Sequence, residues 1–251
     1  MIYIRSLLFN IVGYGIIAVA CIVNSIIGAF HRPLTIKTWN NIFLPGVKLA
    51  LKYIAGLKIE VRGAQYIDQN NCIYAGKHES ALETYVLTTF IKRATLVMKK
   101  ELTYIPIFGW AQAFYGIIPV DRSAGSAAMK SMLRSAKEKL AQQRPIIIFP
   151  EGTRRKPEQE PAYKPGVAML YQHLNVPVIP IATNTGMFWG KNSFLRYPGT
   201  VVFEFLPPIA PGLDKKEFME KLQNVIEEKC HELNMETVKN NPYLKKMLYK
   251  G

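Results

Sequence analysis

The chain has 251 residues, of which 49% are hydrophobic and 20% are charged. This length and balance favour one folded domain with a short appendage, and they exclude a disordered, collagen-like or coiled-coil protein. The formal net charge is +14, from 32 Lys and Arg against 18 Asp and Glu, and it predicts an anionic partner. Charge alone leaves nucleic acid, a membrane surface, a phosphorylated substrate and an acidic carrier protein open. The three cysteines contain no CxxC pair, so they support neither a disulfide framework nor a zinc site.

The amino-terminal segment is the most apolar part of the sequence, because residues 6–30 contain no charged side chain. The run exceeds the roughly 20 residues that cross a bilayer core, so we interpret it as a membrane-spanning helix. A buried core helix is an alternative, and so is a signal peptide, because Arg5 precedes small residues at 18–20. The apolar run continues for ten residues past Ala20, which counts against cleavage there and against a lipoprotein at Cys21.

Basic residues flank this segment unequally. Only Arg5 precedes it, whereas five basic residues follow it before the first acidic residue, Glu60. By the positive-inside rule, the bulk of the protein lies on the cytoplasmic side of the inner (cytoplasmic) membrane. Residues 42–57 add an amphipathic helical pattern that fits either the membrane interface or ordinary packing on the domain. We therefore divide the chain into a membrane-anchoring helical segment, 1–57, and one domain, 58–251.

From residue 58 onward, short apolar runs alternate with helical patterns. This order predicts an α/β fold with a mostly parallel central sheet flanked by helices. The expected strands are 57–61, 72–75, 95–98, 115–120, 146–149, 178–182 and 201–205. The expected helices are 80–92, 126–142, 166–174 and 215–234. The last dozen residues are basic with interleaved Tyr, Leu and Met; a solvated tail is the first expectation and contact with a membrane surface the second.

Ligands of open α/β sheets bind at the carboxyl ends of the strands, so the loops after the expected strands are where chemistry should lie. The loop after the expected strand at 72–75, GKHESALE, contains His78 and Glu83. A histidine can take a proton from an alcohol when its other ring nitrogen donates to a carboxylate. Residues five apart in one helix do not meet, so the pair requires His78 to lie in the loop before the helix. A solvent-exposed histidine before a helix is the alternative.

The later loops carry basic residues. Arg154 follows Gly152 just past a buried strand, where a guanidinium can bind phosphate with two hydrogen bonds. Lys100 and Arg122 follow two other strands, and together the three cations favour a phosphate site. The sequence lacks an HExxH zinc motif, a GxSxG nucleophile elbow and a GxxxxGK[ST] phosphate loop, so those reaction classes lose support.

These residues resemble the four sequence blocks of the glycerolipid acyltransferase family. KHESALE resembles the first block, with Glu83 where the family pattern has aspartate, and YGIIPVDR resembles the second. FPEGTR at 149–154 matches the third, and VPVIPIA at 176–182 is similar to the fourth. KKELTYIPIFGW at 99–110 is similar to the segment between the first two blocks, and residues 4–57 resemble the family's two-helix membrane-associated portion.

The resemblance implies transfer of a fatty acyl group from acyl-CoA or acyl-acyl carrier protein to the 2-hydroxyl of lysophosphatidate, giving phosphatidate for phospholipid synthesis. It implies His78 as general base and Glu83 as its orienting carboxylate, with no acyl-enzyme, cofactor or metal. It places substrate binding on a wider set: Lys100, Arg122, Glu151, Gly152, Thr153 and Arg154. The expected partners are the lipid bilayer, lysophosphatidate and the thioester donor, and nucleic acid is not expected.

Two other functions stay open at this point. The first is an acyltransferase of the same family with another acceptor, such as another lysophospholipid or an acylated amino-acid lipid. The second is a catalytically silent, membrane-tethered basic protein. Dispersed Lys and Arg, without a nucleic-acid-binding motif, count against the second, and FPEGTR would then be unexplained.

Overall fold

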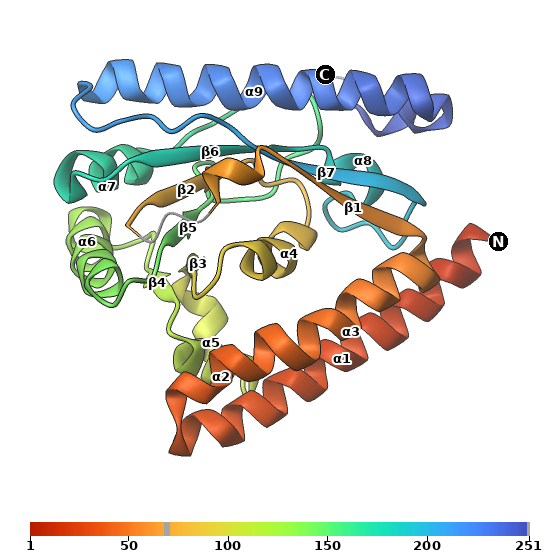
Figure 1. Cartoon of the computed structure of the whole chain (residues 1–251), viewed down its shortest axis with the longest axis horizontal. Coiled ribbons are helices and arrows are strands. Elements are labelled where there is room, and N and C mark those ends of the chain that lie inside the picture. Colours follow the sequence, from red (N-terminus) through yellow and green to blue (C-terminus); the bar gives the residue numbers. More distant parts are fainter. Residues whose placement is uncertain (68–70, 250–251) are drawn as a thin grey trace.

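The computed structural model describes residues 1–67 and 71–249 and contains a central sheet with the strand order β1-β7-β6-β2-β5-β3-β4 (Figure 1). Every neighbouring pair is parallel except β6 and β7, so the predicted α/β fold with a mostly parallel sheet is confirmed. The strands are β1 Leu57–Arg62, β2 Ile73–Gly76, β3 Thr95–Lys99, β4 Ile118–Val120, β5 Ile146–Ile148, β6 Val178–Thr183 and β7 Gly199–Phe205.

Helices cover both faces of the sheet. The α-helices are α1 Ile2–Phe30, α2 Arg32–Thr38, α3 Leu44–Leu49, α4 Leu82–Phe90, α5 Phe108–Tyr115, α6 Gly125–Ala141, α7 Gly166–Leu174, α8 Thr185–Phe188 and α9 Lys215–Asn240. Shorter π-helical turns are η1 Trp39–Phe43 and η2 Ala50–Ala55, and 3-10 turns are η3 Ala64–Tyr66, η4 Lys100–Tyr104 and η5 Pro242–Met247.

The two faces of the sheet form two separate cores because side chains alternate along each strand. Tyr74 and Ile147 belong to the core shared with α4 and the amino-terminal helices. Their neighbours Ile73 and Ile146 belong to the core shared with α6, α7 and α9. All four side chains are fully buried, which explains why these strands read as continuous apolar runs in the sequence.

The amino-terminal helices form a hairpin against the domain. Helix α1 is one limb, and α2, η1, α3 and η2 follow one another along the other, which ends at Gly56 with a φ of +74°. One side of α1 packs inward: Phe9 meets Trp189 edge-to-face at 5.4 Å, and Gly28 lies directly against Phe114. Only 28% of the most apolar window of α1 is buried, so its other side stays uncovered by protein.

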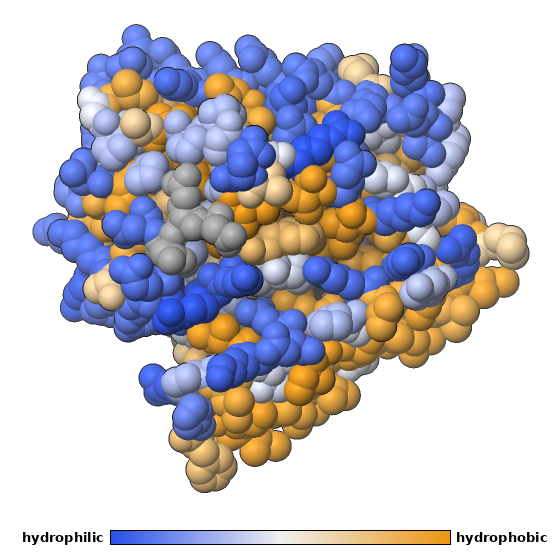
Figure 2. All heavy atoms as spheres, in the orientation of Figure 1, coloured by the Kyte–Doolittle hydropathy of each residue, from blue (hydrophilic) through white to orange (hydrophobic). Residues whose placement is uncertain are grey.

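Apolar and hydrophilic side chains gather on different sides of the surface. Figure 2 shows apolar side chains gathered along the α1 and α3 hairpin, whereas hydrophilic side chains cover the opposite side, near α9. Helix α1 alone exposes Tyr3, Ile4, Leu7, Leu8, Ile11, Val12, Tyr14, Val19, Ile22, Ile26 and Phe30. An apolar patch of this extent on one side of a protein is typical of a membrane contact.

Three expected elements differ from those observed. Residue 115 ends α5, and the strand expected at 115–120 begins only at Ile118. Gly116 adopts a φ of +86° and ends the helix, as glycine commonly does. Helix α9 extends to Asn240 instead of residue 234. The expectation of a solvated tail is wrong for η5, because Leu244 is fully buried there, while residues 250–251 of that tail lie outside the described residues.

Candidate active site

His78 lies in the short loop between β2 and α4, and Glu83 lies in the first turn of α4. The loop position lets the imidazole fold over the helix start, so His78 Nδ1 lies 3.2 Å from Glu83 Oε2. The Glu83 carboxylate is buried, and its Oε1 accepts hydrogen bonds from the backbone N–H groups of Glu79 and Ser80. A carboxylate is an acceptor, so Nδ1 carries the hydrogen and Nε2 is the ring nitrogen that can take a proton.

The imidazole is also held from its face. The ring of Phe149 stacks on the ring of His78 with centroids 4.1 Å apart and an interplanar angle of 16°. Phe149 follows β5, the strand next to β2 in the sheet. The stacked Phe149 ring restricts tilting of the imidazole out of its plane, while the contact with Glu83 restricts rotation of the imidazole within that plane. Together they hold His78 in one orientation, which is a requirement for general-base catalysis.

The loop after β5 carries Arg154, one of the three cations predicted to bind phosphate, and it lies close to a second one, Arg122. Gly152 has a φ of +67°, and a Cβ at this position would lie 3.5 Å from the Arg122 guanidinium carbon. The backbone N–H of Arg155 donates to the carbonyl oxygen of His78 at 2.8 Å, which joins this loop to the loop of the base. The predicted base and the arginines Arg122 and Arg154 therefore meet at one edge of the sheet.

A cavity of about 780 Å³ opens at this edge. Among the described residues that line it, every formally charged side chain is basic: Lys99, Arg122, Arg154 and Lys164. His78 and Thr153 also line the cavity, and most of the remaining lining is apolar: Leu96, Val97, Met98, Leu102, Val120, Ala128, Met129, Met132, Ile148, Phe149 and Val167. The cavity thus combines a base, a cluster of positive charge and an apolar region, and it suits an amphiphilic anion.

The predicted site residues do not all reach this cavity. His78, Arg122, Gly152, Thr153 and Arg154 line it. Glu83 lies behind His78, as an orienting carboxylate would. The other two predicted residues point elsewhere. Lys100 Nζ lies 3.2 Å from Asp121 and is outside the cavity lining, which includes Lys99 instead.

Glu151 is directed away from the cavity, toward α9. Its buried carboxylate lies 3.3 Å from Lys77 Nζ, and Lys77 also reaches Glu227 of α9 at 2.7 Å. Burial raises the pKa of Glu151, and the charge of Lys77 offsets only part of that effect. Burial alone would lower the pKa of Lys77, but the two carboxylates outweigh it, so its pKa is raised. Glu151 therefore has a structural ion-pair partner inside the fold.

Glu79, the residue after His78, faces the same interior. Its carboxylate is buried and accepts a hydrogen bond from the backbone N–H of Gly186 at 2.9 Å. Burial raises the pKa of Glu79 to about 8, and the hydrogen bond from Gly186 only partly opposes this. This residue links the loop of His78 to the start of α8.

Three residues that line the cavity were not predicted from the sequence: Phe149, Lys99 and Lys164. Phe149 belongs to FPEGTR, but nothing in that motif indicates a ring stacked on the histidine. Lys99 is the last residue of β3, and strand alternation gave a signal that Lys99 and Lys100 point in different directions. Lys164 lies 16 residues past the end of β5, and the hydrogen bond from its backbone N–H to the Pro150 carbonyl brings it back to this loop. Only the folded loop could reveal it.

Comparison with known proteins gives several relatives that share one name. A 1-acyl-sn-glycerol-3-phosphate acyltransferase of Pseudomonas aeruginosa is 38% identical over 150 residues, which cover 60% of this chain and 58% of that protein. Its counterpart in Escherichia coli is 26% identical over 94% of this chain and 96% of its own length. The chain spans little more than half the length of several relatives, including 52% of the Cocos nucifera protein of the same name.

A solved structure is similar as well. The 1-acyl-sn-glycerophosphate acyltransferase of Thermotoga maritima superposes with a TM-score of 0.76 at 23% identity, over 93% of this chain and 98% of that one. The model of the Acyltransferase family matches residues 58–184, which contain all four blocks singled out in the sequence together with the His78 and Glu83 pair. With half of its length matched by that model, the chain belongs to the acyltransferase family, as its motifs predicted.

Proposed function

We propose that this protein transfers a fatty acyl group from an acyl thioester to the 2-hydroxyl of 1-acylglycerol 3-phosphate, giving phosphatidate. The observation that carries the proposal is the His78 and Glu83 pair at the wall of a cavity whose charged lining is basic. The acceptor has the matching chemistry: a hydroxyl to deprotonate, a phosphate and an acyl chain. The names of the relatives in Pseudomonas aeruginosa and Escherichia coli support the same reaction.

In the proposed reaction, His78 Nε2 takes the proton from the 2-hydroxyl of lysophosphatidate. The hydroxyl oxygen attacks the thioester carbonyl carbon at the same time. The carbon–sulfur bond then breaks, and the leaving thiolate takes the proton from the imidazolium. Glu83 stabilises the imidazolium through Nδ1–H in the interval. These steps balance without an acyl-enzyme, and we assign no metal or cofactor to them.

Substrate binding follows from the two parts of the cavity. We assign the acceptor phosphate to Arg122 and Arg154, with Lys99 and Lys164 adding positive charge at the same cavity. We assign acyl chains to its apolar part, near Met129. For the donor we propose a thioester of either coenzyme A or acyl carrier protein, since both carry the same phosphorylated pantetheine next to the sulfur.

The test is acyl transfer by the purified, detergent-solubilised full chain. Long-chain acyl-CoA and acyl-acyl carrier protein are each offered with lysophosphatidate, glycerol 3-phosphate and lysophosphatidylcholine. We expect phosphatidate as the main product. Preferential acylation of lysophosphatidylcholine would assign another acceptor to the same chemistry, and no transfer from either donor to any acceptor would contradict the proposed enzyme and favour a silent binding protein.

Arg154→Ala should act through the acceptor phosphate. Loss of a charge-assisted hydrogen bond predicts a rise in KM for lysophosphatidate of about ten- to hundredfold, with a smaller effect on kcat. Monoacylglycerol, which lacks the phosphate, should be affected much less. Arg134→Ala is the matched control, because Arg134 is an exposed arginine of α6 outside the cavity lining. Equal losses for both acceptors would remove Arg154 from the phosphate site.

We also propose that the hairpin side of the molecule rests on a lipid bilayer, with the main domain on the cytoplasmic side. The support is the apolar patch on α1, together with Lys48 and Lys52 on the adjacent limb. Replacing Ile4, Leu8 and Ile11 with Glu should release the protein from anionic vesicles in a flotation experiment. Met235→Glu, on exposed α9, is the control and should stay bound. Undiminished flotation of the triple variant would contradict this orientation.

A further inference from the structure

The Glu83 carboxylate has a third hydrogen-bond donor on Oε1, besides the two backbone N–H groups of its own loop. This donor is the hydroxyl of Thr185, a fully buried residue that opens α8 and lies 102 positions further along the chain. The two residues meet because β6, which precedes Thr185, is the neighbour of β2, which precedes His78. Thr185 therefore contacts the carboxylate that orients the base, without lining the cavity itself.

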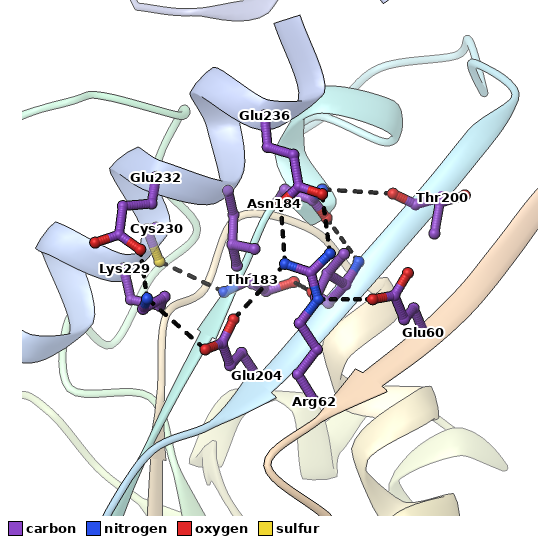
Figure 3. Close-up of polar contacts among 12 residues, drawn as sticks. Glu60, Arg62, Thr183, Asn184, Thr200, Glu204, Lys229, Cys230, Glu232 and Glu236 are labelled. Atoms are coloured by element: carbon purple, nitrogen blue, oxygen red, sulfur yellow. Dashed lines mark hydrogen bonds and ion pairs between the residues drawn. The ribbon is translucent and has the colours of Figure 1, made fainter. Parts of the chain in front are cut away.

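Thr185 is held more firmly than a residue in a free loop. Its backbone N–H donates to the hydroxyl of Thr183, which in turn donates to the carbonyl of Val202 in β7. Asn184 accepts from the Val202 N–H at 2.8 Å and donates to the Thr237 hydroxyl of α9 at 2.8 Å. Figure 3 shows Thr183 and Asn184 between the strands and α9, near Arg62 and its ion pair with Glu236.

The side chain of Thr185 is stiff for a second reason. Threonine is branched at Cβ, so few χ1 rotamers are open to it once its backbone is fixed. Glu83 is the opposite case, because a glutamate has one more rotatable bond than the aspartate of the family pattern. A longer carboxylate needs an additional contact to keep Oε2 against His78 Nδ1. The Thr185 hydroxyl supplies that contact from an anchored strand end.

We propose that Thr185 is a positioning residue: its hydroxyl fixes the Glu83 carboxylate and, through it, the orientation and tautomer of His78. The expected effect on kcat rests on the proposed function. The hydrogen bonds from Thr185 to Glu83 and from His78 to Glu83 do not, because they form without substrate. The chain runs from the Thr185 Oγ1 to the Glu83 Oε1, and from the Glu83 Oε2 to the His78 Nδ1. Thr185 acts on the reaction only by way of Glu83.

Thr185→Val keeps the shape and removes the hydroxyl. We expect kcat to fall about ten- to hundredfold, the order of loss that follows misplacement of a reacting group, while KM for lysophosphatidate stays within about twofold. Thr185→Ser restores the hydroxyl and should restore most of kcat. Thr95→Val is the matched control: it also removes a fully buried threonine hydroxyl, which donates to the Gly116 carbonyl and not to Glu83, and it should keep wild-type kcat. Wild-type kcat in Thr185→Val would overturn the proposal.

The coupling to Glu83 separates positioning from general damage. In a Glu83→Gln background the orienting carboxylate is already lost, so Thr185→Val should lower kcat by less than about twofold further. A loss as large as in the wild-type background would show that Thr185 acts independently of Glu83, and would overturn the inference.

A spectroscopic measurement keeps the test independent of activity. In protein labelled with ¹⁵N-histidine, the His78 resonances, assigned by their loss in His78→Ala, should report the Nδ1–H tautomer in wild type and Thr185→Ser. Thr185→Val should show a mixture of tautomers. If wild type acylates no acceptor but this pattern holds, the proposed function fails while the inference survives. An unchanged tautomer in Thr185→Val overturns the inference whatever the activity.

Discussion

His78→Ala should lower kcat for acyl transfer by about 10² to 10⁴-fold, the range that a positioned general base contributes. The side chain lines the cavity, its Nδ1 is engaged by Glu83 and its ring rests on Phe149, so Nε2 is placed for one task. Alanine removes the proton acceptor and leaves Arg122 and Arg154 unchanged. The affinity for lysophosphatidate should therefore stay close to that of wild type.

The measurement compares initial rates at saturating substrates with equilibrium binding of lysophosphatidate to the same preparations. His173→Ala is the matched control, because His173 is an exposed histidine of α7 outside the cavity lining and should be dispensable. Wild-type turnover in His78→Ala would refute the general-base assignment. Loss of binding together with turnover would instead assign His78 to the acceptor site.

Among the proposed substitutions, Lys77→Ala should lower the free energy of unfolding the most. The ammonium group of Lys77 is buried against Glu151 at 3.3 Å and Glu227 at 2.7 Å, so alanine leaves the buried Glu151 carboxylate with only the more distant Arg155, at 3.7 Å. Removing one partner of a buried ion pair costs about 3 to 5 kcal/mol. For a chain of this size the melting temperature should fall by about 6 to 20 °C.

Thermal unfolding in detergent, followed by circular dichroism, tests this prediction. The double variant Lys77→Met with Glu151→Gln removes both buried charges, so it should recover part of the lost melting temperature. Lys221→Ala, an exposed lysine of α9, is the control. An unchanged melting temperature in Lys77→Ala would mean that water or a rearranged side chain compensates Glu151.

The sequence allowed the architecture of the fold and the contact between His78 and Glu83 to be predicted. Continuous apolar runs identified the buried strands. The helix expected to start soon after the strand at 72–75 indicated that His78 and Glu83 could meet, and His78 Nδ1 does lie 3.2 Å from Glu83 Oε2. The same apolar signal misled at residues 115–117. A short apolar run is compatible with helix or strand, and the turn at Gly116 decides between them.

Side-chain direction was harder to predict than position. Lys100 and Glu151 belong to the right loops, but Lys100 pairs with Asp121 and Glu151 pairs with Lys77. A motif gives the identity of consecutive residues, whereas alternate side chains at the end of a strand point to opposite sides. Thr185 had no local signal at all, because only the neighbouring positions of β2 and β6 in the sheet bring it to Glu83.

The hydrogen bond from the Arg155 N–H to the His78 carbonyl holds two loops of the candidate site together. It joins the loop of His78 to the loop of Arg154 through main-chain atoms alone, and only proline at position 155 would remove the donor itself. In the proposed function, this bond limits how far the backbone that carries the base can move from the backbone that carries the phosphate ligand. If His78 and Arg154 act as proposed, we expect slower acylation of an acceptor whose hydroxyl lies one carbon nearer to or farther from its phosphate.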